Sequence, residues 1–183
     1  DQLLTSLALL QTRLWNFLNM LQNKIISTFR NKQGRPLEFK KFPENAIKMI
    51  DEINAMNPDV VLDLGCGTNL YKDKINNLIG VDILDRHEDV TCAIEDLYTK
   101  FDENYADVIL ALGSINFGND DLILKQIKQV KRVCKPNGLI YFRCNPISTH
   151  EIYFQWDFDK IDYYTKICNF EYVKTPRTIK KVR

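Results

Sequence analysis

The chain has 183 residues, of which 45% are hydrophobic and 27% charged, and its formal net charge is +1. This length and hydrophobic content suit one folded domain and exclude a globally disordered chain. No apolar run approaches the length of a membrane-spanning helix, so we expect no membrane association. The five cysteines include no C-x-x-C pair, so they predict no zinc or other metal site and no disulfide framework. Scattered thiols favour a reducing, cytoplasmic setting.

Charge is distributed unevenly along the chain. Residues 1–43 carry seven Lys and Arg against two acids, and residues 172–183 carry five with no acid, so the segment between them is acidic. Basic ends beside an acidic body would suit an anionic substrate. Two solvated, Lys-rich terminal segments explain the same pattern more simply.

Residues 3–29 are predicted to form one long amphipathic helix. Its apolar stripe repeats at alternating spacings of four and three residues at Leu3, Leu7, Leu10, Leu14, Phe17 and Leu21, and continues four residues later to Ile25. Such a stripe packs against its own domain, or against a partner chain or a second copy in a homodimer. A basic linker follows, so we expect an N-terminal extension over 1–43 and a main domain over 44–183. The linker has aromatic residues among its cations, but no nucleic-acid-binding module accompanies it, so this indication of nucleic acid binding is weak.

From residue 44 onward, strands and helices are expected to alternate. Strands are predicted at 60–64, 78–84, 90–94, 106–112 and 139–143, with two more at 171–175 and 178–183. Helices are predicted directly after Pro43, as a short element after the first strand, and at 121–134 and 158–168. This alternation predicts a doubly wound α/β fold, with a mostly parallel sheet and helices on both faces.

The most informative segment is the glycine-rich turn after the first strand. The two glycines of Gly65-Cys66-Gly67 lack a Cβ atom, so the turn can be tight and a ligand can lie against its backbone. The next strand ends in Asp82, which a doubly wound sheet places beside that turn, where it can accept hydrogen bonds from a ribose diol. A dinucleotide fingerprint needs a third glycine where Leu70 stands. The acid at Asp63 suits a cationic amino acid group better than a pyrophosphate.

These residues resemble the class I S-adenosylmethionine-dependent methyltransferases. Asp63-Leu64-Gly65-Cys66-Gly67 resembles their first motif, and Gly80-Val81-Asp82-Ile83 their second. Residues 107–110 resemble the fourth strand, and the Val-Cys-Lys-Pro-Asn-Gly run at 133–138 resembles the turn before the fifth. The resemblance covers about residues 44–183. It implies the Rossmann-like fold of that family, S-adenosylmethionine as cofactor, and methyltransferase activity in the 44–183 domain.

The resemblance also implies a cofactor site. Backbone atoms of Gly65, Cys66 and Gly67 would contact the methionine part, and Asp63 would hold that end by charge or through water. Asp82 would bind both ribose hydroxyls, and Ile83 would lie against adenine. Further members are expected at the ends of the third and fourth strands and directly after the fourth: Ala93, Ile94, Leu112, Gly113 and Ser114. Ala93 stands where the family often has an Asp for the adenine amino group, so that contact would need Glu95.

No catalytic residue is evident, because methyl transfer from a sulfonium mainly requires alignment of the acceptor. His150 follows the fifth strand and is a candidate base, although a solvated loop histidine explains it more simply. The aromatic residues Tyr153, Phe154, Trp156 and Phe158 would either line an acceptor pocket or, as is more usual, fill the core. The size of the chain favours a small-molecule acceptor. The alternatives are an RNA or protein acceptor, or a catalytically silent cofactor-binding subunit.

Overall fold

The computed structural model describes residues 44–144 and 153–171. Three expectations lie outside these residues: the helix and linker over 1–43, the loop histidine His150, and the final strands beyond residue 171. In the described part of the chain, no helix has both the length and the apolar character needed to span a bilayer.

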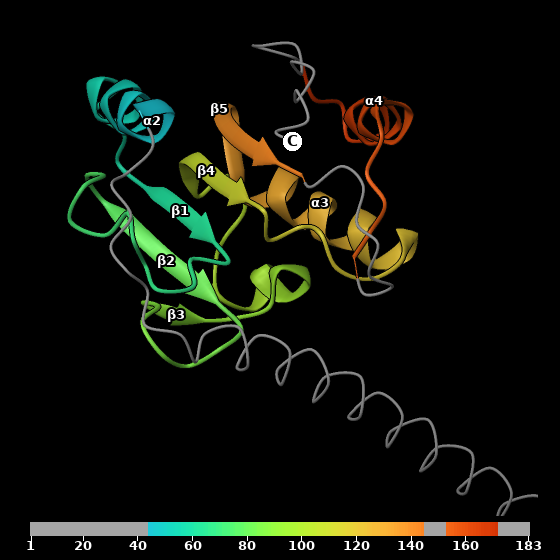
Figure 1. Cartoon of the computed structure of the whole chain (residues 1–183), viewed down its shortest axis with the longest axis horizontal. Helices are drawn as coiled ribbons and strands as arrows, with labels where there is room; N and C mark the ends of the chain where they lie inside the picture. Colours follow the sequence, from blue (N-terminus) through green and yellow to red (C-terminus); the bar gives the residue numbers. More distant parts are fainter. Residues whose placement is uncertain (1–43, 145–152, 172–183) are drawn as a thin grey trace, which may run out of the picture. The chain divides into compact units, whose positions relative to one another are not determined.

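The described residues form a five-stranded parallel sheet in the order β3-β2-β1-β4-β5 (Figure 1). The strands are β1 (Val61–Leu64), β2 (Leu78–Asp82), β3 (Val90–Thr91), β4 (Ala106–Leu112) and β5 (Cys134–Arg143). The strand order reverses direction between β1 and β4, which confirms the doubly wound fold. In such sheets, ligands bind at the carboxyl ends of the strands on either side of this reversal.

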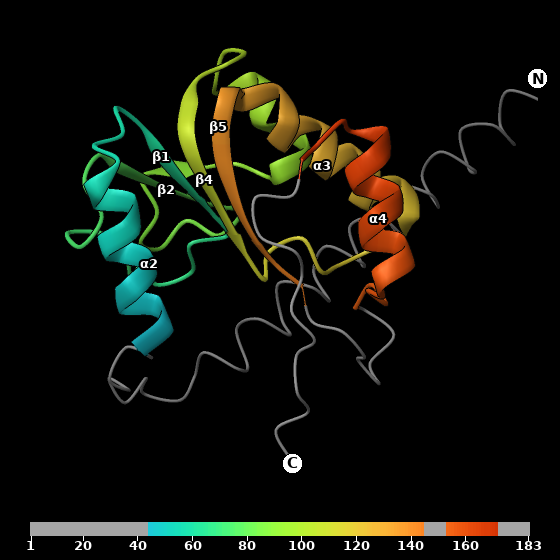
Figure 2. The ribbon, with the colours of Figure 1, turned by 90° about the horizontal axis from the view of Figure 1, so that it is seen from above.

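Helices cover both faces of the sheet (Figure 2). On one face, Ile53 of α2 (Glu44–Ala55) packs against strand residues that include Val61 and Val108. The other face is covered by α3 (Asp120–Val133), α4 (Phe158–Ile167) and the short 3-10 helix η1 (Ile94–Thr99). Because side chains alternate along a strand, Leu62 and Leu64 of β1 face α3, and Asp63 shares the otherwise apolar face with Val61.

The helix expected directly after the glycine turn is absent, and residues 67–77 form successive turns instead. Asn69, Asp73 and Asn77 have φ angles of +54°, +63° and +56°. Left-handed residues at every fourth position interrupt the right-handed hydrogen-bonding pattern, so an α-helix cannot propagate through them. The prediction of a short helix was therefore wrong.

Four strands also differ from their predicted bounds: β1 begins at Val61 rather than 60, and β2 ends at Asp82 rather than 84. β3 ends at Thr91 rather than 94, because the chain turns into η1 at Ile94. β5 begins at Cys134, and the turn expected at 136–138 lies within it as an irregularity in the pairing with β4. Asn137 takes up this irregularity in the left-handed conformation, with a φ of +65°.

Candidate functional site

The glycine turn after β1 lies directly against the segment that follows β4. Gly65 has a φ of +71°, and its N–H donates to the carbonyl of Val81 at 2.7 Å. A Cβ atom placed at Gly65 would lie only 2.5 Å from Cβ of Ser114, so no larger residue fits without displacement. The structure thus brings together two of the segments that the sequence predicted to share a site.

Asp82, at the end of β2, lies beside the same turn. Its Oδ2 accepts a hydrogen bond from the N–H of Gly67 at 2.9 Å, and its Oδ1 accepts one from Leu84 N–H at 3.0 Å. Each carboxylate oxygen has a second lone pair, so both can also accept from a ligand diol. Gly67 borders open space, since no described atom lies within 4 Å of where its Cβ would be.

Asp63 is a buried acid at the centre of this edge. It pairs in register with Gly80 on β2 and Leu110 on β4, and only 4% of its surface is exposed. Burial, and secondly the charge of Asp82, raise the pKa of Asp63 from 3.8 to about 7. Among the described residues, no Lys or Arg forms an ion pair with it. The site therefore presents an uncompensated carboxyl group, which favours a cationic ligand.

Cys66 cannot serve as a nucleophile in this setting. Burial, together with the nearby charges of Asp63 and Asp82, raises the pKa of the Cys66 thiol to about 12. The thiol therefore remains protonated at neutral pH, and thiols react as thiolates. Only the backbone of Cys66 suits the role that the sequence predicts for it.

The residues expected around adenine lie next to Asp82. Ile83 is the next residue after β2, and 45% of its surface is exposed, which is unusual for so large an apolar side chain. Ala93 directly precedes η1, and the carbonyl of Asp82 accepts a hydrogen bond from Cys92 N–H at 2.8 Å. These contacts bring the start of η1 to the end of β2.

Glu95 does not take the place of the acid that is missing at position 93. Its carboxylate accepts a hydrogen bond from Nε2 of Gln126 on α3 at 3.0 Å. This contact directs Glu95 to the helix layer. Ile94, the other residue expected here, has its side chain in the core, so only its backbone is available to a ligand.

The segment after β4 contains the predicted residues Gly113 and Ser114, and two polar side chains that the sequence analysis did not single out, Asn116 and Arg143, contact it. Gly113 has a φ of +104°, and its carbonyl accepts a hydrogen bond from Asn116 Nδ2 at 2.9 Å. Arg143, the last residue of β5, donates from Nη2 to the carbonyl of Leu112 at 2.6 Å. Ser114 Oγ is buried and has no hydrogen-bond partner among the described residues. A buried hydroxyl of this kind is a natural partner for a polar ligand group.

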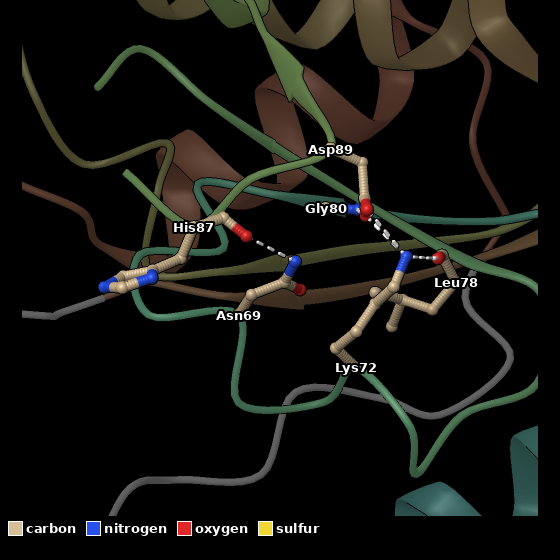
Figure 3. Close-up of polar contacts among 6 residues, drawn as sticks. All are labelled: Asn69, Lys72, Leu78, Gly80, His87 and Asp89. Atoms are coloured by element: carbon tan, nitrogen blue, oxygen red, sulfur yellow. Dashed lines mark hydrogen bonds and ion pairs between the residues drawn. The ribbon is translucent and has the colours of Figure 1, made fainter. Parts of the chain in front are cut away.

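The turns that replace the expected helix after β1 are fixed by side-chain contacts (Figure 3). Asn69 Nδ2 donates to the carbonyl of His87 at 2.8 Å, and Lys72 Nζ forms an ion pair with Asp89 at 2.7 Å. Asp89 Oδ2 also accepts the N–H of Gly80 at 2.7 Å. These contacts link the turns to both β2 and the loop before β3, and so position the glycine turn relative to Asp82.

Removing Asp89 is expected to cost more stability than removing its partner Lys72. Asp89→Ala loses both the ion pair and a charged hydrogen bond to backbone, so we expect a loss of about 1 to 2 kcal/mol in the free energy of unfolding. Lys72→Met leaves the contact with Gly80 intact but loses the hydrogen bond that Lys72 Nζ donates to the carbonyl of Leu78 at 2.9 Å. A carbonyl left without this partner costs less than an N–H left without an acceptor, and the pair is partly exposed, so we expect a loss of about 1 kcal/mol or less. Urea unfolding of both variants measures the difference. A larger loss for Lys72→Met would contradict this account.

The two glycines of the turn are expected to respond differently to an added methyl group. Both have positive φ angles, so an alanine at either position is strained by about 1 kcal/mol. Only at Gly65 does the methyl group also collide with Ser114. Gly65→Ala should therefore lower the free energy of unfolding more than Gly67→Ala does. Gly67→Ala should instead weaken binding of the expected cofactor, about tenfold, by occupying the open space. Equal stability losses would contradict the close packing of Gly65.

The aromatic residues after β5 are mainly part of the core. Phe154 and Trp156 are 4% and 3% exposed, and Trp156 Nε1 donates to the carbonyl of Ile115 at 2.9 Å. Phe158 is exposed at the start of α4, and the ring of Tyr153 lies 5.1 Å from that of Phe117. The more usual interpretation, core packing, therefore holds for Phe154 and Trp156, which do not line an acceptor pocket.

Comparison with known proteins identifies the domain. Residues 62–142 match the model of a methyltransferase domain, whereas no curated protein matches the chain by sequence. One similar structure is 1,6-didemethyltoxoflavin-N1-methyltransferase of Burkholderia thailandensis, solved with 1,6-didemethyltoxoflavin and S-adenosylhomocysteine. It has 16% identity and a TM-score of 0.57, and the match covers 84% of this chain and 77% of that one.

Two further structures share the fold. A SAM-dependent methyltransferase from Archaeoglobus fulgidus has 13% identity and a TM-score of 0.55, over 70% of this chain and 69% of its own. The [4+2]-cyclase SpnF has 17% identity and a TM-score of 0.53, and the match covers 71% of this chain and 57% of that one. At such identities the likeness shows the fold alone. The match to the methyltransferase model covers less than half of the chain, and it shows that residues 62–142 form a methyltransferase domain.

Proposed function

We propose that this chain transfers a methyl group from S-adenosylmethionine to a small-molecule acceptor, with the cofactor lying across the carboxyl ends of β2, β1 and β4. One observation carries the proposal. The glycine turn after β1 meets the segment after β4, while Asp82 lies beside Gly67 and open space. This is the edge at which doubly wound sheets bind ligands, and its residues suit both ends of this cofactor.

Each end of the site has a distinct role in binding. Asp82 accepts hydrogen bonds from the ribose hydroxyls, and the exposed side chain of Ile83 covers one face of adenine. The backbones of Ala93 and Ile94 lie at the far side of the adenine site. At the other end, Gly65, Cys66 and Gly67 allow close approach of the backbone, and Asp63 stabilises the positive charge of the methionine part.

The bound cofactor supplies a methyl group on a sulfonium, which is an already activated carbon. The protein then has to orient the acceptor and exclude water, and proximity supplies much of the acceleration. Leu112, Gly113 and Ser114 lie where the acceptor and the methyl group would meet. The buried hydroxyl of Ser114 is suited to orienting a polar atom there. No residue is assigned as a general base.

A small acceptor is supported by the Burkholderia enzyme, whose structure contains 1,6-didemethyltoxoflavin. The five cysteines of this chain are free thiols, which supports the proposed cytoplasmic location. One observation favours the alternative, a cofactor-binding subunit without turnover. Glu95 is engaged by Gln126 and leaves the adenine contact at Ala93 unfilled. The cyclase SpnF, which shares the fold, is a further reason to test binding and turnover separately.

The test is a calorimetric titration of the full chain with S-adenosylmethionine, S-adenosylhomocysteine and NAD. We expect micromolar affinity for the first two and no binding of NAD. Transfer of a radiolabelled methyl group to small molecules, RNA or protein then separates an enzyme from a silent subunit. Absence of binding to either S-adenosyl compound would overturn the proposal.

A further inference from the structure

Arg143 occupies a position next to the proposed site that cofactor binding does not explain. It is the last residue of β5 and pairs in register with Leu112, the last residue of β4. Its Nη2 donates to the carbonyl of Leu112 at 2.6 Å, and it lies 3.3 Å from where a Cβ of Gly113 would be. The guanidinium group therefore lies over the first residue after β4, next in sequence to the buried hydroxyl of Ser114.

The side chain of Arg143 is exposed, and this one contact uses only part of its hydrogen-bonding capacity. A guanidinium has five N–H donors arranged as a planar fork. Among the residues that the structure describes, no Asp or Glu forms an ion pair with it. Its charge acts on nearby groups: burial, and secondly the charge of Asp63, raise the pKa of Tyr71, whereas the charge of Arg143 acts to lower it. The edge of the sheet thus has an acidic part at β1 and a basic part at β5.

The order of the strands indicates which ligand would meet this cation. Asp82 on β2 takes the ribose, and the charged end of the cofactor lies between β1 and β4. Methyl transfer from a sulfonium is an in-line displacement, so the acceptor approaches from the side opposite the departing sulfur. Continuing from β2 through β1 and β4, the next strand is β5, which ends in Arg143.

We propose that Arg143 binds an anionic group, a carboxylate or a phosphate, of the methyl acceptor. This inference rests on the proposed function and narrows its acceptor to anionic small molecules. A planar fork matches the geometry of carboxylate and phosphate oxygens, so two parallel hydrogen bonds would fix the orientation of the acceptor beside Ser114. Arg143 is thus a residue that determines specificity and positions the acceptor.

The cofactor also has a carboxylate, which is a second anionic group that an arginine here can bind. The first titration tests whether Arg143 binds this carboxylate of the cofactor rather than the acceptor. S-adenosylhomocysteine is titrated into the wild-type chain, Arg143→Gln and Arg86→Gln. Arg86 is an exposed arginine on the loop after β2, and its variant loses the same charge. We expect all three affinities to agree within about twofold. The inference is overturned if Arg143→Gln alone binds at least tenfold more weakly and S-adenosyl-3-thiopropylamine, which lacks the carboxylate, shows no such loss.

The second titration probes the anion site in chain saturated with S-adenosylhomocysteine. Benzoate, phenyl phosphate and neutral benzamide are compared by ligand-observed NMR at millimolar concentration. We expect an anion to bind at least about tenfold more tightly than benzamide, and Arg143→Gln to lose that preference. Arg143→Lys should retain part of it, and Arg86→Gln all of it. Thermal unfolding of each variant confirms that it is folded.

Two kinds of failure are distinguishable. If S-adenosylhomocysteine does not bind the wild-type chain, the proposed function fails and this inference fails with it. If S-adenosylhomocysteine binds but the anions bind no better than benzamide, or bind equally well to Arg143→Gln, only this inference is overturned.

Discussion

Replacing Asp63 by Asn is expected to make the free protein more stable at pH 8 while weakening its affinity for the cofactor. The pKa of Asp63 is about 7 in the folded chain, against an ordinary value of 3.8. Between these pH values the folded state binds more protons than the unfolded state, so the free energy of unfolding falls as pH rises. The total loss is about 4 kcal/mol and is complete above the folded pKa. Because Asn cannot ionise, Asp63→Asn does not undergo this loss of stability.

Urea unfolding of the wild-type chain and Asp63→Asn at pH 5 and pH 8 measures this effect. The stability of the variant relative to wild type should rise by about 2 to 3 kcal/mol between these two pH values. Asp85→Asn, which changes an exposed carboxylate on the loop after β2, serves as the control and should follow the wild type. The same pH dependence in wild type and Asp63→Asn would show that Asp63 is not a strained, buried acid.

Ionisation of Asp63 lowers the stability of the free protein, but it is expected to strengthen cofactor binding. A cationic ligand favours the carboxylate, so binding near pH 7 should release a proton from Asp63. The affinity for S-adenosylhomocysteine should therefore rise about tenfold from pH 6 to pH 8. Calorimetry in buffers of different ionisation enthalpy counts the released proton. Asp63→Asn should lose both the proton release and this pH dependence.

Replacing Asp82 by Ala is expected to weaken S-adenosylhomocysteine binding by about 2 to 3 kcal/mol, or about 30- to 150-fold in Kd. The variant loses the acceptors for two ribose hydroxyls. It also loses the hydrogen bond that Gly67 N–H donates to this carboxylate at 2.9 Å. Asp82→Asn keeps one acceptor oxygen and should show a smaller loss. An unchanged affinity in Asp82→Ala would mean that the ribose site lies elsewhere.

Methylthioadenosine provides a control that separates the two acids. This ligand keeps the ribose and adenine of the cofactor but lacks its amino acid part. Asp82→Ala should weaken its binding as much as that of S-adenosylhomocysteine, whereas Asp63→Asn should leave it nearly unchanged. Asp82→Ala should also lower the pKa of Asp63, because one of the two causes of its rise is the charge of Asp82.

Much of this site could be predicted from the sequence because its key signals are local. The apolar run before Gly65 predicts β1, and the paired glycines predict a tight turn. The position of Asp82 at the end of the next strand follows from parallel pairing alone. The structure accordingly places Asp82 against Gly67, as the motif predicts.

Other features depend on contacts between distant segments and could not be predicted in this way. The pairing of Lys72 with Asp89 joins the turns after Gly67 to the loop before β3, which is 17 residues further along the chain. A sequence signal for these turns was available, since Asn and Asp adopt the left-handed conformation more readily than most residues. Arg143 was overlooked because its importance comes from the carbonyl it meets on β4. The roles of residues 1–43 stay predictions.

The turns at 67–77 also bear on how a ligand could enter the site. A helix opens cooperatively, because each of its hydrogen bonds supports the next. Here the segment is closed by separate short-range bonds, such as Asn69 N–H to Cys66 and Lys72 N–H to Asn69, together with a few side-chain links. Such a segment can open one turn at a time while the sheet beneath it stays folded. Its backbone amides should therefore exchange with solvent well before those of β1 and β4, and the bound cofactor should slow that exchange.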